Sequence, residues 1–130
     1  MSPGINDPGT ALNALDYLTE LLALRMQKQD EQYLKNDDDI IIKMKSVSFG
    51  ELLYQVLAPI RGYCKHDIII VQKLGWMFKY LKTQKSVNEE YYKIMDNEAK
   101  NIIFDAKSVI DNKADLEKIN TIQKQLNLEF

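Results

Sequence analysis

The sequence predicts a mainly α-helical protein, a compact bundle of about five helices with one short β-hairpin between the first and second helices. Apolar residues recur every three or four positions through most of the chain, which is the period of a helix with one buried face. Capping residues precede several of these segments. Residues 31–45, in contrast, combine β-branched residues with a polar, turn-forming stretch, which is typical of a hairpin.

The length of the chain favours a single domain. Its 130 residues are enough to bury a self-supporting core, and 45% hydrophobic with 28% charged residues is an ordinary globular composition. We therefore expect one soluble domain over residues 1–130.

The first helix is predicted to begin at Pro8. Ser2–Thr10 contains two prolines and two glycines, and Asp7 can cap a helix whose first residue is a proline. Helical spacing continues to about Gln27–Asp30. The predicted buried face consists of Ala11, Leu12, Leu15, Leu18, Leu21, Leu22 and Met26.

The hairpin is predicted to follow, with arms at Glu31–Leu34 and Asp39–Lys45. Because a lone hairpin is only marginally stable, we expect it to lie against the helices or to pair with a partner's strand. The acidic run Asp37–Asp39 could suggest a calcium site. It lacks the glycine and distal glutamate of an EF-hand loop, so a solvated turn is the favoured interpretation.

Capping signals divide the rest of the chain into four helices. Ser48 and Glu51 form a capping box for the second helix, which Pro59 should kink or shorten before a break at Gly62–His66. Asp67 is a plausible N-cap for the third helix, with apolar positions to Leu81.

Capping signals also delimit the last two predicted helices. Ser86–Glu89 is a second capping box, which is predicted to open a long fourth helix. Asp111–Lys113 should end that helix, and a weaker last helix follows through Leu126.

Charge and cysteine content exclude several classes of protein. The formal net charge of −2 gives no basic field for nucleic acid, so we expect no nucleic-acid partner. The single cysteine, Cys64, suits a reducing compartment. No apolar run approaches the ~20 residues of a membrane span, and no signal peptide is recognisable.

Several strings in the first two thirds of the chain resemble a known family. They are the opening Ser-Pro-Gly-Ile-Asn-Asp-Pro at residues 2–8, Thr10-Ala11, Leu15-Asp16, the acidic hairpin, Ser48-Phe49, Glu51-Leu52, and Ile60-Arg61 before the helix after Asp67. With these strings the chain resembles the C-terminal segment of predicted bacterial membrane proteins, the domain of unknown function numbered twenty-two fifty-four. The resemblance ends near Tyr80.

This resemblance implies a soluble segment at the end of a multi-span membrane protein, on the cytoplasmic face of a bacterial membrane. We therefore expect the chain to be a fragment of a longer protein. The implied partners are its own transmembrane segment and a second copy of the chain, as a homodimer.

The opening turn is the candidate ligand site. Glycine-rich turns that lead into a helix N-terminus expose backbone N–H groups beside the positive end of the helix dipole. An anion or polar ligand would contact Gly4, Ile5, Asn6, Asp7 and Thr10. The alternative, which we favour, is that Asn6 and Asp7 simply cap and brace the turn, because Asp7 would repel an anion.

Catalytic and metal chemistry are not expected. Cys64, His66 and Asp67 lie close together in the sequence, but one histidine and one cysteine are too few for a zinc site, and no third group orients a thiol–base pair. Trp76, Phe78 and Tyr80 are interpreted as core and surface-edge aromatics. The nearby lysines at 79, 82 and 85 could face lipid head groups, but the simpler interpretation is that they form a solvent-exposed face.

The sequence thus favours a non-enzymatic domain with an interaction, self-association or regulatory role and no cofactor. The alternative is a small-ligand receptor domain that uses the opening turn.

Overall fold

The computed structural model describes residues 8–35, 41–45, 47–64 and 66–128. These residues form five helices and one pair of strands, so the prediction of a mainly helical protein with five helices is confirmed. The elements in chain order are α1 (Pro8–Arg25), β1 (Glu31–Lys35), β2 (Ile41–Lys45), α2 (Phe49–Cys64), α3 (Ile68–Thr83), α4 (Glu90–Val109) and α5 (Lys113–Gln125).

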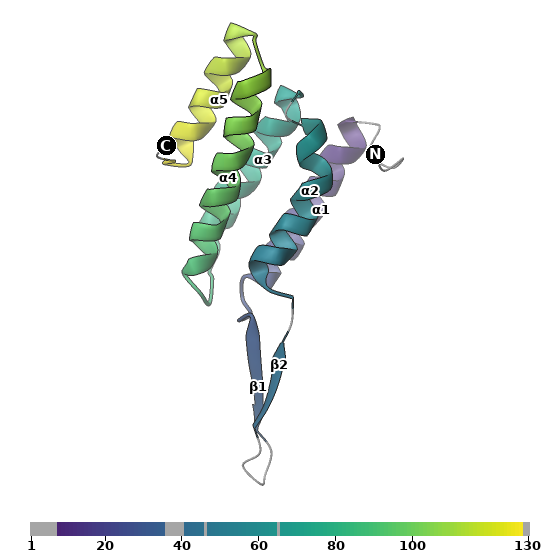
Figure 1. Cartoon of the computed structure of the whole chain (residues 1–130), viewed down its shortest axis with the longest axis vertical. Coiled ribbons are helices and arrows are strands. Elements are labelled where there is room, and N and C mark those ends of the chain that lie inside the picture. Colours follow the sequence, from purple (N-terminus) through teal and green to yellow (C-terminus); the bar gives the residue numbers. More distant parts are fainter. Residues whose placement is uncertain (1–7, 36–40, 46, 65, 129–130) are drawn as a thin grey trace.

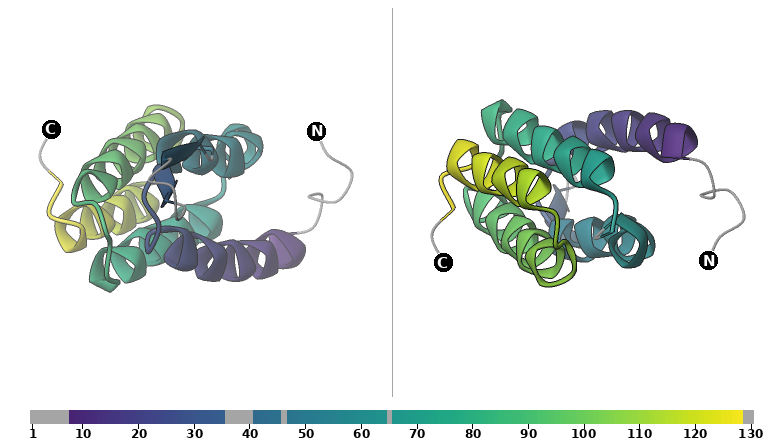
Figure 2. Two further views of the ribbon diagram at one scale, coloured as in Figure 1. Left: turned by 90° about the horizontal axis from the view of Figure 1, so that it is seen from below. Right: turned by 90° about the horizontal axis from the view of Figure 1, so that it is seen from above.

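The helices pack in two layers. α1 lies beside α3 in one layer, α2 lies beside α4 in the other, and α5 covers the side of the bundle against α3 and α4 (Figures 1 and 2). α3 is the central element, because it contacts each of the other four helices. Burying apolar side chains between these layers is the main source of the fold's stability.

The core draws on all five helices. Its largest fully buried side chains are Leu15, Leu22, Met26, Phe49, Leu53, Leu57, Leu74, Met77, Phe78, Leu81, Tyr91 and Met95. The predicted apolar positions of α3 are buried, including Gly75 at its contact with α5, except Ile68, which is partly buried against the core. A Cβ added at Gly75 would lie 2.6 Å from Cγ2 of Ile122, so a larger residue would push the two helices apart.

Two predicted caps are confirmed. The hydroxyl oxygen of Ser48 accepts a hydrogen bond from the backbone N–H of Glu51 at 3.2 Å, which begins α2. The carboxylate of Asp67 accepts from the N–H of Ile69 at 3.0 Å, which begins α3. Each side chain satisfies a backbone donor that the first turn leaves unpaired.

The start of α4 was predicted wrongly. Ser86 does not cap the helix; its hydroxyl donates to the carbonyl of Asn88 at 2.7 Å and closes a turn before it. Asn88 instead accepts from the N–H of Glu90 at 3.0 Å, and the helix begins there. Both side chains can bond to nearby backbone, so the sequence alone did not decide between them.

The predicted break after α2 begins later than expected. The helix continues past Pro59 and through Gly62 to Cys64. Proline removes one helical hydrogen bond, that to the carbonyl four residues earlier, at Gln55. Pro59 and Gln55 are both exposed, so water can satisfy that carbonyl.

Between α1 and α2 the chain forms a two-stranded antiparallel sheet. The register runs from Glu31 opposite Lys45 to Lys35 opposite Ile41. β1 and β2 contact each other and, within the described residues, no helix. The pair extends from the end of the bundle where α1 ends and α2 begins (Figure 1). The acidic run at residues 37–39 lies outside the described residues.

Candidate functional site

The opening turn cannot be placed in the fold. Gly4, Ile5, Asn6 and Asp7 lie outside the described residues, and so does the predicted capping role of Asp7. α1 begins at Pro8, as predicted, and Thr10 lies exposed in its first turn. The ligand site that was expected there stays a prediction.

The densest polar cluster lies where α1 ends, at the base of the hairpin. The carboxylate of Asp30 accepts a hydrogen bond from Nη2 of Arg25 at 2.7 Å and from the backbone N–H of Phe49 at 2.8 Å. The Tyr91 hydroxyl lies 3.0 Å from the same carboxylate oxygen and 2.9 Å from the carbonyl oxygen of Lys28. These contacts join the end of α1 to the first turns of α2 and α4.

The ionisable groups of this cluster, which we call the junction, shift the pKa values of their neighbours. Burial alone would raise the pKa of Asp30, but the hydrogen bonds from Phe49, Arg25 and Tyr91 hold it below its ordinary value. Burial raises the pKa of the Tyr91 hydroxyl, and the neighbouring Asp30 raises it further. Asp30 is therefore held as an anion and Tyr91 as a neutral donor.

Aromatic packing completes the junction. The Tyr91 ring stacks on Phe49 with centroids 4.6 Å apart, and the Arg25 guanidinium lies 5.8 Å from the Tyr91 centroid. Each polar group of the cluster is bonded to another group of the same cluster. The arrangement is therefore suited to holding three helices and the hairpin base together, and less suited to proton transfer.

A different kind of surface covers the outer side of α1. Tyr17, Leu21 and Leu24 are 69%, 46% and 61% exposed, and their spacing of four and three residues places them in one stripe along the helix. Leu21 was predicted to widen the buried face, and this is wrong. The core side of α1 is filled by Leu15, Leu22 and Met26 instead.

Charged side chains are scarce on α1. The helix has 18 residues, and its charged members are Asp16, Glu20 and Arg25. Asp16 is paired with Lys73 of α3 at 2.5 Å, and Arg25 belongs to the junction. Glu20 is thus the charge that remains for the outer side of this helix. A helix that is apolar on both sides is typically covered on both sides.

Of the residues considered for catalysis, Cys64 has a side chain that lies outside the described part of the structure. Asp67 is engaged as the cap of α3, and His66 is exposed in the turn before it. Across the described part of the chain, no three histidine, cysteine or acidic side chains come together where they could hold a metal ion. Nor does any described helix have the length and apolar character to cross a membrane.

The fold and its surface define a small two-layer helical domain whose first helix is apolar on its outer side. The chain belongs to the family described as "Predicted membrane protein (DUF2254)", whose model matches residues 1–80. The match covers α1 through most of α3 and confirms the resemblance, including its end near Tyr80. No curated protein and no solved structure matches the chain significantly.

Sequence reasoning missed the outer stripe of α1 because it counted every leucine toward the core. A signal was nevertheless present: leucines and a tyrosine occupy both sides of the helix, with three charges in 18 residues. Periodicity identifies a buried face, but it does not identify a second face that meets a partner.

Proposed function

We propose that this chain is a non-enzymatic self-association domain, in which α1 pairs with α1 of a second copy. The observation that carries this proposal is the outer stripe of α1, formed by Tyr17, Leu21 and Leu24. Contiguous apolar surface of this kind marks an interaction site, whereas isolated exposed apolar residues do not.

The stripe is suited to an antiparallel pair. Tyr17 lies four residues before Leu21, and Leu24 lies three residues after it, so the stripe is nearly symmetric along the helix. In an isologous dimer the same patch meets itself about a two-fold axis. Tyr17 of each copy would then pack against Leu24 of the other, and the two Leu21 side chains would meet near the axis.

The pairing should be weak in solution. A standard interface buries roughly 800 Å² on each partner, more than three side chains on one helix supply. In a longer membrane protein, both copies would be held at the same membrane, on its cytoplasmic face in this proposal. The higher effective concentration would then favour the pair. The role would be to join or regulate the membrane-spanning parts, which are the second expected partner.

Sedimentation equilibrium over a range of protein concentrations tests the proposal. The unmodified chain should show a concentration-dependent dimer, and Leu21→Glu should remain monomeric because it buries a charge in the pair. Phe104→Glu is the matched control, since Phe104 is the one large apolar residue that is exposed among the described residues of α4, at 67%. A chain that stays monomeric at millimolar concentration, or a Leu21→Glu variant that still dimerises, contradicts the proposal.

Cysteine cross-linking tests the antiparallel geometry. In a Cys64→Ser background, Tyr17→Cys and Leu24→Cys chains should form a mixed disulfide when combined. Neither variant should cross-link efficiently with itself, because equal positions would lie about 10 Å apart along the pair, at 1.5 Å per residue. Efficient cross-linking of Tyr17→Cys with itself would indicate a parallel pair instead.

A further inference from the structure

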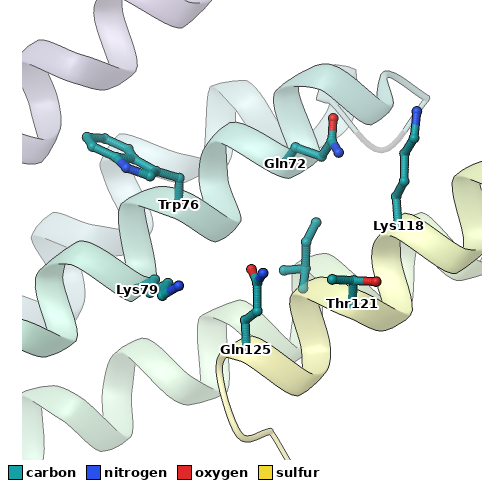
Figure 3. Close-up of a pocket in the computed structure, with 7 residues that line it drawn as sticks. Gln72, Trp76, Lys79, Lys118, Thr121 and Gln125 are labelled. Atoms are coloured by element: carbon teal, nitrogen blue, oxygen red, sulfur yellow. The ribbon is translucent and has the colours of Figure 1, made fainter.

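A second surface, between α3 and α5, has the opposite character to the stripe of α1. It is a groove of about 260 Å³, with Gln72, Trp76 and Lys79 on the α3 side and Lys118, Thr121 and Gln125 on the α5 side. Ile122 also lines the groove and forms its floor, where it packs against Gly75 of α3. Figure 3 shows the lysines well apart, Lys79 beside Gln125 and Lys118 near the opposite end.

The polar groups of this groove are available to a ligand. The side chains of Gln72, Lys79 and Gln125 make no hydrogen bond or ion pair with any other described residue. Lys118 has one distant neighbour, Asp115, whose carboxylate lies 3.9 Å from its ammonium. The Thr121 hydroxyl donates to the carbonyl of Glu117 at 3.0 Å and keeps its acceptor capacity.

The walls of the groove are held in place by contacts beneath and beside it. Gly75 lets α3 approach Ile122 closely, which fixes the floor. Lys82 forms an ion pair with the carboxylate of Asp96 at 2.8 Å and donates a hydrogen bond to the carbonyl of Leu126 at 3.0 Å, so it ties α3 to α4 and to the end of α5. A site held by packed helices loses little conformational freedom when it binds.

Trp76 lies between Gln72 and Lys79 along the α3 wall, and its side chain is itself held in place. Its ring stacks on Tyr80 with centroids 5.6 Å apart, and the ammonium of Lys73 lies 4.2 Å from its centroid. Cation–π and stacking contacts of this kind fix the orientation of an indole that would otherwise be mobile at 47% exposure. Trp76 is also the single tryptophan of the chain, so its fluorescence reports on this groove.

The charge balance of the groove decides the class of ligand. Two ammonium groups and two side-chain amides line it, and no aspartate or glutamate is among its lining residues. This contrasts with the chain as a whole, which has a net charge of −2. Ammonium groups bind phosphate as point charges, and amide N–H groups add hydrogen bonds to its oxygens.

We propose that this groove binds a phosphate-bearing anion that spans its length, with Lys79 and Lys118 as the charged contacts at its two ends. Gln72 and Gln125 donate hydrogen bonds to the phosphate oxygens. The site is independent of α1 pairing, and its α5 wall lies beyond residues 1–80, which the family match covers. The phosphate can come from a free small molecule or from a lipid head group.

The test uses the fluorescence of Trp76 with sodium pyrophosphate as the probe, in parallel with vesicles of phosphatidylglycerol. The unmodified chain should show a saturable change with at least one of them. Lys79→Gln with Lys118→Gln should weaken that binding by about tenfold or more, because both charged contacts are lost. Calorimetry with the same probe gives the stoichiometry, which should be one per chain.

The matched control is Lys93→Gln with Lys100→Gln, which removes the same charge from α4, outside the groove. This control should bind as the unmodified chain does, and thermal melts should show that both double variants are folded. Saturable pyrophosphate binding assigns the site to a free anion, and binding of vesicles alone assigns it to a lipid head group. Absence of binding to both, or equal weakening in the control variant, overturns the proposal.

Discussion

α1 and α4 have similar lengths but differ in how their outer sides are built. α4 carries seven charged residues in 20, and its exposed side is mostly polar. α1 carries three in 18, and Tyr17, Leu21 and Leu24 lie exposed along it. Both helices bury a full apolar face in the same core. The difference is therefore in what each helix presents outward.

This comparison separates an ordinary exposed residue from an interaction surface. Phe104 on α4 is 67% exposed, nearly as much as Tyr17, but its helix neighbours at positions 101, 107 and 108 are polar. A single exposed apolar side chain is normal in a soluble protein, while a stripe over two turns is not. The exposed side of α4 is that of an ordinary surface helix, whereas the stripe on α1 is the surface where we propose that a second copy binds.

The largest expected effect compares two adjacent leucines of α1. Leu22 is 1% exposed and Leu21 is 46% exposed. Leu22→Ala should lower the free energy of unfolding by about 2–5 kcal/mol, because it leaves a cavity in the core. Leu21→Ala should change it by less than about 0.5 kcal/mol in dilute solution and should weaken dimerisation. Urea denaturation of both variants checks this, and equal losses would show that the outer side of α1 belongs to the core.

The next prediction concerns the junction that links the end of α1 to the start of α4. The pKa of Asp30 is lowered in the folded chain, so its stabilising contribution is complete above about pH 4 and is lost as the pH falls through the folded-state value. Urea denaturation between pH 7 and pH 2.5 should show that loss. Asp30→Asn should be less stable at pH 7 by about 1–2 kcal/mol and should lose less on acidification. A variant that loses as much as the unmodified chain would contradict this role.

The smallest effect concerns Glu20, the charge on the outer side of α1. In the antiparallel pair the two Glu20 side chains lie near the two-fold axis on the same side, so they repel each other. Glu20→Gln should strengthen dimerisation about twofold, since such like-charge contacts cost a few tenths of a kcal/mol. Glu90→Gln on α4 is the control and should leave the dimer constant unchanged. Weaker dimerisation of Glu20→Gln would contradict the proposed arrangement.

Much of the helical framework follows from local sequence. Asp67 and Ser48 cap their helices as predicted, because a short acceptor side chain beside an apolar periodic segment has few other local uses. The buried positions of α3 were predictable from their spacing for the same local reason. Where two acceptors compete within three residues, as Ser86 and Asn88 do, the local signal does not choose between them.

The candidate sites were less predictable, since each depends on residues far apart in the chain. In the junction, Asp30 contacts Tyr91, which lies 61 residues later in the sequence. No local pattern around either residue predicts this contact. The groove is formed by Lys79 and Lys118 on two neighbouring helices. From the sequence alone, Lys79 was interpreted as part of a solvent-exposed face, because the position of the second helix was not known. The opening turn, where the sequence placed a ligand, lies outside the described residues.

The sequence by itself determined the class of fold, most helix boundaries, the family and one buried face for each helix, because these depend on periodicity, caps and motif strings. Tertiary structure alone decided which leucines of α1 face the core, how closely α3 approaches α5 at Gly75, and which polar groups meet. A helix with apolar residues all round has no preferred inner side until its neighbours are in place. Packing against α3 gives α1 that inner side and leaves Tyr17, Leu21 and Leu24 exposed on the other.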